Sequence, residues 1–270
     1  MTLYLFNPSH DEALAAHTPY YYPTKIARHL AVVWGMLPGI WAEPGDLVWV
    51  DEALTEEEIA NQRGVWCEGV RFVHTRELNA ALWGQVDRVE PWGWDALVHR
   101  QLLKAGAPAQ LLPDATQLET IRQLSSRQTT ERVLPALVQR LTACGIPAVG
   151  ESRIVAALPE AHTLLQQWGG AMIKALWSCS GRGVFRVSEQ LSALEHGRMA
   201  KLLREQGAFE MQRFYDGRFD FALEFSVSPS GEVLYEGPSY FRTSPLGGYS
   251  GNVIQPIATL EHEIAGKIGD

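Results

Sequence analysis

The stretch MIKALWSCSGRGVFRV, residues 172–187, joins two apolar runs through a turn of small residues, SCSGRG. The runs are typical of two strands, and the small residues between them leave several backbone N–H groups uncovered. Such a turn can wrap an anion, and Lys174, inside the first run, would supply the opposite charge. The stretch therefore predicts a phosphate-binding hairpin; a flexible turn with the Lys174 amine extended into water is the alternative.

Two common phosphate-binding motifs are absent from the sequence. GxxxxGK[ST] does not occur, and no GxGxxG follows the first predicted strand, so neither a P-loop nor a Rossmann dinucleotide site is supported. A phosphate site would have to be built from Lys174 and the hairpin turn.

Composition and charge restrict the partners. The chain has 270 residues, 46% of them hydrophobic and 20% charged, which is more than one compact domain usually holds. The net charge is −8 and no segment concentrates Lys and Arg, so a nucleic-acid partner is not expected. Uncharged runs such as 30–42 are shorter than the roughly 20 residues of a membrane span. Three scattered cysteines without a CxxC pair favour a reducing cytoplasm and argue against structural zinc. We expect a cytoplasmic protein with a small-molecule substrate and no membrane partner, and nothing in the sequence indicates its oligomeric state.

Residues 1–114 alternate strand-like and helix-like segments. Strands are predicted at 3–6, 46–50 and 70–74, and helices at 25–34, 54–62 and 94–106, with Thr55 and Glu58 in a capping-box pattern. This alternation predicts an open, parallel α/β sheet. Ligands of such sheets bind beyond the carboxyl ends of the strands, which places the polar stretch NPSHDE at the rim of a cleft. The substrate-binding candidates there are Asn7, His10 and Asp11, and a plain turn at Asn7 is the alternative.

The rest of the chain is predicted as two further parts. Residues 115–206 form a small α+β lobe, in which Thr116 and Glu119 predict the start of one helix. A second helix, after the interruption SSRQ (125–128), should hold Pro135 in its first turn. In residues 207–270, AFEMQRFYDG (208–217) leads into FDFALEFSV (219–227), an alternating strand. PSG (229–231) should turn this strand into an antiparallel partner.

The order of these segments resembles the ATP-grasp superfamily. The chain has a basic residue in SSRQ, then GIPAV (145–149), the Lys174 strand, the glycine-rich turn and the strand FEMQRFYDG (209–217), and the family shows the same succession. The resemblance covers roughly residues 115–237. It implies an α/β pre-ATP-grasp-like domain at 1–114, an α+β ATP-grasp-like nucleotide-binding lobe at 115–206 and the start of a second lobe, apparently truncated, at 207–270.

The resemblance also implies roles for individual residues. Lys174 matches the strand lysine that reaches the α- and β-phosphates of ATP, and Arg127 matches a basic residue near the phosphates. The loop that closes over the phosphates corresponds to Ser178, Ser180, Gly181, Arg182 and Gly183. The segment whose backbone reads the adenine edge corresponds to Gln212, Arg213, Phe214 and Tyr215. Asp220 is a candidate for the ribose contact.

Two departures from the family pattern concern the predicted site. Many members have a glutamate where this chain has Gln212, and Glu210 stands two residues earlier. The magnesium ligands of the family, an acid followed by a Glu-x-Asn strand, are not found before Asp270. ATP and Mg²⁺ are the implied cofactors, but the metal ligands are unknown. Either the chain is part of a longer product or the metal site is lost.

A narrower resemblance links NPSHDEALA (7–15) and GPSYFRTSPLGGYSGN (237–252) to an uncharacterised bacterial ATP-grasp-like group. It implies that the second stretch is a loop facing the nucleotide, and the alternative is an exposed loop rich in Gly, Pro and Ser. The substrate-binding candidates in this stretch are Ser239, Thr243, Tyr249 and Asn252.

The activity implied is that of an ATP-dependent carboxylate–amine ligase, which activates a carboxylate as an acyl phosphate for attack by an amine or related nucleophile. Lys174 and Arg127 would supply the catalytic charges. The missing magnesium motif leaves a second hypothesis open, a nucleotide-binding module without catalysis. A third is a protein in which SCSGRG is only a turn.

Overall fold

The computed structural model of the chain describes residues 1–179, 181–217, 220–228, 230–243, 249–255, 258–259, 261–262 and 265. The chain divides into two compact units, Met1–Arg132 and Val133–Asp270. The predicted domain limits at residues 114 and 206 stay predictions. None of the helices in the described residues is long and apolar enough to cross a membrane.

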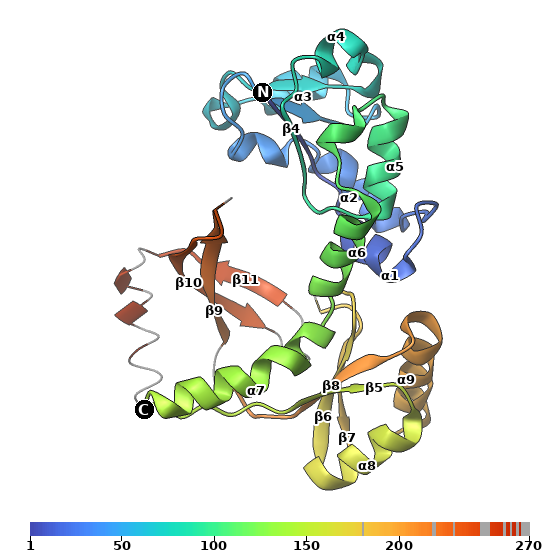
Figure 1. Ribbon diagram of the computed structural model, residues 1–270, viewed down its shortest axis with the longest axis vertical. Helices are drawn as coiled ribbons and strands as arrows, with labels where there is room; N and C mark the ends of the chain where they lie inside the picture. The colour runs from blue at the N-terminus through green and yellow to red at the C-terminus, as the bar shows by residue number, and fades with distance from the viewer. Residues whose placement is uncertain are drawn as a thin grey trace. The chain divides into compact units, whose positions relative to one another are not determined.

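A four-stranded parallel sheet forms the centre of the first unit, as the alternating pattern predicts (Figure 1). Its strands run in the order β3-β2-β1-β4. They are β1 (Thr2–Leu5), β2 (Leu47–Trp49), β3 (Arg71–Val73) and β4 (Arg88–Pro91). β4 was not predicted from the sequence. It pairs with β1 so that Leu5 stands opposite Pro91. The carboxyl ends of β1 and β4 are therefore neighbours.

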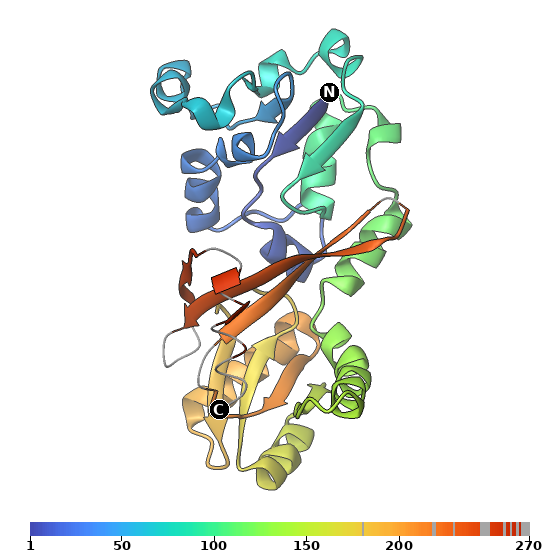
Figure 2. The same ribbon diagram turned by 90° about the vertical axis from the view of Figure 1, so that its left-hand side faces the viewer.

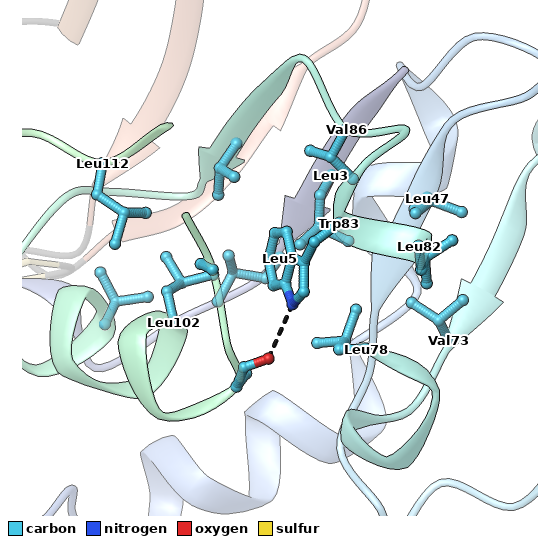
Figure 3. Close-up of a cluster of buried hydrophobic side chains, with 14 residues drawn as sticks. Leu3, Leu5, Leu47, Val73, Leu78, Leu82, Trp83, Val86, Leu102 and Leu112 are labelled. Carbon is cyan, nitrogen blue, oxygen red and sulfur yellow. Dashed lines mark hydrogen bonds between the residues drawn. The ribbon is translucent and has the colours of Figure 1, made fainter. Parts of the chain in front are cut away.

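Alternating side chains of this sheet pack into a hydrophobic cluster on each face. Leu3 and Leu5 belong to one cluster, and Tyr4, between them, belongs to the other. Figure 3 shows the first cluster, in which the indole Nε1 of Trp83 donates to the carbonyl oxygen of Ala105 at 2.8 Å. The one polar atom of the Trp83 side chain is thus satisfied inside the core. The parallel sheet is therefore packed against a core on both faces.

The helices of the first unit connect these strands and follow β4. α3 (Glu56–Gln62) begins with the predicted capping box of Thr55 and Glu58. α6 (Ala115–Leu124) is capped by Asp114 and Gln117, two residues before the predicted pair Thr116 and Glu119. The other α-helices are α1 (His10–Ala16), α2 (Lys25–Val33), α4 (Ala80–Trp83) and α5 (Ala96–Lys104). Short 3-10 turns lie at Leu37–Ile40, Val65–Cys67, Thr75–Glu77 and Ala109–Leu111.

An antiparallel sheet with the order β5-β8-β6-β7 follows in the second unit. Its strands are β5 (Ser152–Val155), β6 (Gly170–Ala175), β7 (Val184–Ser188) and β8 (Phe209–Arg213). Helices α8 (Leu158–Trp168) and α9 (Ala193–Gln206) supply Leu165 and Met199 to a core that also contains Ile173 and Phe209. One face of the sheet is therefore apolar, and the residues that alternate with this face point the other way.

Helix α7 (Gln128–Ala143) corrects one prediction. Pro135 is its eighth residue and does not lie in its first turn. The helix begins immediately after the turn that contains SSR, which is earlier than the apolar pattern suggested. It continues past Pro135 although proline has no N–H to donate, and strong helix formers such as Leu134 and Ala136 flank this position.

A three-stranded antiparallel sheet with the order β11-β10-β9 completes the described fold. β9 (Asp220–Val227) and β10 (Val233–Thr243) form the predicted hairpin, which is a long twisted ribbon in Figure 2. β11 (Tyr249–Val253) pairs with the end of β10. The stretch 237–252, expected to be a loop, is therefore strand on both sides of residues 244–248, which lie outside the described residues.

Candidate functional site

Lys174 lies near the end of β6, on the face of the sheet opposite the core. Ala171, Ile173 and Ala175 point into the core, so the alternation of the strand directs Lys174 away from it. The ammonium Nζ of Lys174 donates to the side-chain oxygen Oε1 of Gln212, on β8, at 2.5 Å. The structure thus brings together two residues that the sequence analysis assigned to the nucleotide.

Gln212 connects Lys174 to a buried carboxylate. The amide Nε2 of Gln212 donates to Oε1 of Glu210 at 2.9 Å, and the hydroxyl of Ser152, on β5, donates to the same oxygen at 2.8 Å. Glu210 is only 1% exposed and stands opposite Lys174 in the pairing of β6 with β8. A buried carboxylate needs hydrogen bonds and a nearby cation, and the three neighbouring side chains supply both.

An arginine and an aromatic ring lie on the same face. Met172 stands opposite Arg186 of β7 and Gln212 of β8, so these side chains point in one direction. The guanidinium carbon of Arg186 lies 3.6 Å from the centre of the Phe214 ring. This contact orients a planar aromatic surface next to the strand that holds Lys174.

The segment predicted to read the adenine edge begins inside β8 and continues beyond it. The backbone N–H of Arg213 donates to the carbonyl of Glu151, and that of Phe214 to the carbonyl of Gly170, both at 3.1 Å. The N–H groups of Arg213 and Phe214 are therefore used in hydrogen bonds to neighbouring backbone and extend the sheet. Tyr215 follows with 42% of its surface exposed. Contact of Gln212 to Tyr215 with adenine stays a prediction.

The glycine-rich turn depends on two glycines in the left-handed region of the backbone. Gly181 has φ of 75° and Gly183 has φ of 67°. A Cβ atom on Gly183 would lie 2.8 Å from the Cβ of Ala175, so a larger residue would displace β6. The N–H of Ala175 donates to the carbonyl of Gly183 at 2.9 Å and closes the turn. The described end of this turn, residues 181–183, is therefore held against the last residue of β6, next to Lys174.

The entry to this turn is held by the side chain of Gln206, on α9. Its Oε1 accepts from the N–H of Trp177 at 3.1 Å, and its Nε2 donates to the carbonyl of Trp177 at 3.2 Å. Within the turn, the N–H of Arg182 donates to the carbonyl of Cys179 at 3.0 Å. Ser178 lies at the entry, whereas Ser180 lies outside the described residues.

Arg127 lies in the turn between α6 and α7 and belongs to the first unit. Its carbonyl accepts from the N–H of Thr130 at 3.0 Å, at the start of α7. Lys174 belongs to the second unit, so the expected proximity of Arg127 to the same phosphates stays a prediction.

A histidine–aspartate pair lies at the carboxyl edge of the parallel sheet. Nδ1 of His10 is 3.1 Å from Oδ2 of Asp95, and Nδ2 of Asn7 donates to the same oxygen at 3.1 Å. The other oxygen, Oδ1, accepts from the N–H of Val98 at 2.8 Å and caps α5. A carboxylate only accepts hydrogen bonds, so this contact needs a proton on Nδ1 of His10, and in the tautomer that carries this proton alone Nε2 can accept a hydrogen bond.

Gly93 provides the space for the His10 ring. A Cβ atom on Gly93 would lie 2.3 to 2.5 Å from Cδ2, Nε2 and Cγ of His10. Asn7 joins Gly93 to this site, since its Nδ2 donates to the Gly93 carbonyl at 2.8 Å and its Oδ1 accepts from the Gly93 N–H at 3.1 Å. The side chain of His10 is 17% exposed and that of Asp95 is 1% exposed. Asp11, the second residue of α1, is half-buried.

The residues that support each predicted side chain were not predicted from the sequence. Asp95 and Gly93 were missed because they follow β4, which was not predicted. Asp95 could have been found from the sequence, because an aspartate before the apolar run ALVHRQLL has the pattern of a helix N-cap. Ser152 and Arg186 were missed because only strand pairing places them beside Gln212 and Phe214. Glu210 was noted only as an acid two residues before Gln212, the position where many family members have a glutamate.

The remaining predicted residues meet on the sheet of β9, β10 and β11. Phe241 of β10 stands opposite both Asp220 and Asn252, so these residues share a face. The hydroxyl of Thr243 donates to Oδ2 of Asp220 at 2.5 Å. The ring of Tyr249 lies 6.5 Å from that of Phe241. Ser239, two residues before Phe241 on β10, points to the same face. Contact of this face with a ribose or an acceptor stays a prediction.

A metal site does not follow from the part of the chain that the structure describes. That part contains no group of three or more His, Cys, Asp or Glu side chains arranged to hold a metal ion. The described residues therefore identify no ligand for a Mg²⁺ ion.

Comparison with known proteins identifies the fold of the chain but not its reaction. No protein-family model matches the sequence, and no curated protein matches it. The biotin carboxylase βγ-ATP complex from Campylobacter jejuni matches with a TM-score of 0.52 and 15% identity, over 99% of this chain and 58% of that chain. The biotin carboxylase domain of the Hydrogenobacter thermophilus 2-oxoglutarate carboxylase, in complex with MgADP, ADP and bicarbonate, matches with a TM-score of 0.50 and 13% identity. That match covers 83% of this chain and 51% of the other.

The chain has an ATP-grasp fold. This confirms the fold that the order of the sequence motifs implied. The chain spans 58% and 51% of the lengths of these two structures, so each of them contains regions with no counterpart in the match. At such low identity the likeness establishes the fold alone.

Proposed function

We propose that this protein binds ATP and uses it to activate the carboxylate of a small molecule for attack by an amine or related nucleophile. The observation that carries the proposal is the polar face of the β5–β8 sheet, where Gln212 holds the Lys174 ammonium next to the glycine-rich turn. The ATP-grasp fold supports the same ligand class, because both biotin carboxylases were solved with a bound adenine nucleotide or an analogue.

The proposed reaction has two steps. A carboxylate oxygen attacks the γ-phosphorus of ATP, the bond to the β-γ bridging oxygen breaks, and ADP leaves with its electron pair. The nucleophile then attacks the carbonyl carbon of the acyl phosphate, phosphate leaves, and the nucleophile loses a proton. Phosphoryl transfer depends mainly on positioning and on neutralising charge, so an ammonium that contacts the phosphate oxygens lowers the barrier. Lys174 takes this role in the proposal, together with Arg127 and the amides of the turn.

His10 takes the role of a substrate contact. Its Nδ1 proton is committed to Asp95, so its Nε2 can accept a hydrogen bond from an N–H or O–H group of the acceptor or the nucleophile. Asn7 and Asp11 belong to the same proposed contact, and Ser239, Thr243, Tyr249 and Asn252 to a second one. Asp220 is the proposed ribose contact.

Lys174→Ala tests the nucleotide part of the proposal. Calorimetric titration of the purified chain with ATP should give an affinity at least about tenfold lower for Lys174→Ala than for the unmodified protein, because a charge-assisted contact is lost. Lys201→Ala is the matched control, since Lys201 lies on α9 and forms an exposed i,i+4 pair with Glu205. Equal ATP affinity in Lys174→Ala and Lys201→Ala would remove Lys174 from the nucleotide site.

Hydroxylamine trapping tests the reaction. Hydroxylamine attacks an acyl phosphate and releases phosphate, which leaves a hydroxamate of the carboxylate. Incubation with ATP, Mg²⁺, hydroxylamine and each member of a panel of amino acids and other small carboxylates should produce phosphate and a hydroxamate in equal amounts. ATP binding without either product, across the whole panel, would favour a nucleotide-binding module without catalysis.

A further inference from the structure

Glu210 is a buried carboxylate on the face of the sheet that carries the proposed ligand site. Its neighbours on β8, Phe209 and Met211, point into the core, so Glu210 points to the polar face. It is nevertheless 1% exposed. Burying an isolated carboxylate at such a depth is costly, because the charge loses its hydration. The residue opposite it on β6 is Lys174, whose ammonium is the natural counter-charge.

Gln212 stands between the two charges and has a defined orientation. Its carboxamide offers a donor, Nε2, and an acceptor, Oε1. The donor contacts Glu210 at 2.9 Å and the acceptor contacts the Lys174 ammonium at 2.5 Å. Rotating the carboxamide by half a turn would set its oxygen against the carboxylate and its N–H groups against the ammonium. The charge on Glu210 therefore determines which end of Gln212 faces Lys174.

Ser152 anchors the far end of this series of contacts. Its hydroxyl donates to the same oxygen of Glu210 that Gln212 contacts. Ser152 lies on β5, Glu210 and Gln212 on β8, and Lys174 on β6. Three adjacent strands thus contribute to a single line of polar side chains that ends at the Lys174 ammonium.

We propose that Glu210 is a positioning residue for Lys174 and acts through the Gln212 carboxamide. It fixes the amide so that Oε1 holds the ammonium over the sheet before the nucleotide arrives, which reduces the side-chain entropy lost on binding. The inference rests on the proposed function for the statement that Lys174 meets the phosphates of ATP. The geometry of the four side chains stands without that statement.

Exchanging the acid and the amide tests the proposal. Glu210→Gln keeps the size of the side chain and removes the charge that orients Gln212. Gln212→Glu places a second carboxylate beside the first. In the double variant Glu210→Gln/Gln212→Glu, the new amide at 210 can accept from Ser152 and donate to the acid at 212, and that acid can hold Lys174. Glu236→Gln is the control, because Glu236 accepts from Ser226 on the exposed β9–β10 hairpin.

ATP affinity and thermal unfolding are to be measured for all four variants. We expect each single exchange to weaken ATP binding about tenfold, and the double exchange to return it to within about threefold of the original value. Glu236→Gln should bind ATP as the unmodified protein does. ATP affinity equal to that of the unmodified protein in both single variants would overturn the positioning role. A double variant that binds ATP as weakly as the weaker single variant would overturn it as well.

The two readouts separate this inference from the proposed function. If the unmodified protein binds no ATP, the proposed function is wrong. The unfolding temperatures alone then test whether Glu210 orients Gln212 and Lys174. Lower unfolding temperatures in both single variants, restored in the double variant, would support the coupled orientation of Glu210, Gln212 and Lys174. Additive losses would show that Glu210 and Gln212 act independently, and would overturn it.

Discussion

Each unit buries one carboxylate beside a candidate functional side chain, but the two units satisfy that carboxylate differently. Asp95, in the first unit, accepts from the first turn of α5, from Asn7 and from His10. Glu210, in the second unit, lies in the middle of a strand and accepts from Ser152 and Gln212, opposite the ammonium of Lys174.

The difference concerns what each carboxylate supports. The partners of Asp95 include the backbone of a helix terminus, where the helix dipole favours a negative charge without any cation. Glu210 lies within a strand and accepts from side chains next to the proposed ligand site. Loss of Asp95 should therefore reduce stability most, whereas loss of the Glu210 charge should change ATP binding most.

The largest stability effect is expected for Asp95→Ala. It removes the cap of α5 and leaves the polar groups of Asn7 and His10 without their buried acceptor, at a cost of about 3 kcal/mol. Urea unfolding gives the loss, and hydrogen exchange should place it within residues 1–132. Asp114→Ala is the matched control, because Asp114 caps α6 from an exposed position and should cost about 1 kcal/mol. Equal losses in the two variants would show that burial of Asp95 adds nothing.

Gly93→Ala should have the next largest effect. The new methyl group collides with the His10 ring, so the variant should lose about 1 to 3 kcal/mol of stability as an overpacked site. The double variant Gly93→Ala/His10→Ala removes the collision and should be more stable than the sum of the two single losses predicts. Urea unfolding of all three variants measures this coupling. Strict additivity would mean that His10 does not lie against Gly93.

Ser152→Ala measures how much one hydrogen bond to Glu210 contributes to stability, for comparison with Asp95→Ala in the first unit. It deletes one hydrogen bond to Glu210 and leaves the contacts among Glu210, Gln212 and Lys174 in place. The expected loss of stability is about 1 kcal/mol, smaller than that for Asp95→Ala. Urea unfolding checks it, with hydrogen exchange reporting on β5 and β8. A loss as large as that of Asp95→Ala would contradict the proposed contrast between the two units.

The smallest expected effect is a loss of stability at low pH, and we expect it in both units. Hydrogen bonds from the backbone and the hydroxyl of Thr55 hold the pKa of Glu58 below its usual 4.5, and those from the hydroxyl and backbone of Ser192 do the same for the pKa of Glu195. A lowered folded-state pKa adds stability that is fully present above 4.5 and is lost as the pH falls through the folded value.

Glu58→Gln and Glu195→Gln measure this contribution. Unfolding temperature followed from neutral pH downward should show each variant below the unmodified protein at neutral pH and approaching it in acid. A gap that stays constant across this range would mean that the two acids carry no pH-dependent stability.

Sequence periodicity predicted most local features of the fold. The parallel sheet, the β9–β10 hairpin and the Thr55–Glu58 capping box follow from alternation and from cap residues, which are local patterns. β4 escaped prediction because RVEP is short and ends in proline, a residue that usually argues against a strand interior. The cap of α6 was placed two residues late because Asp114 and Gln117 have the same pattern as Thr116 and Glu119.

The candidate site was only partly predictable. Lys174 stood out as a charge inside an apolar run, and the order of motifs around it indicated the ATP-grasp fold. His10 stood out because it follows the first strand in a polar stretch. The residues that hold both in place gave no comparable signal, because a serine or an acid within a strand has no local pattern of its own.

The sequence by itself determined which residues alternate on each strand, where the glycine-rich turn bends, and that Lys174 faces away from the apolar side of β6. The tertiary structure decided which strands are neighbours. Asp95 meets His10 only because β4 pairs with β1, and Ser152, Glu210, Gln212 and Lys174 align only because β8 lies between β5 and β6. Strand order and register are set by burying each apolar face as a whole, which no single stretch of sequence specifies.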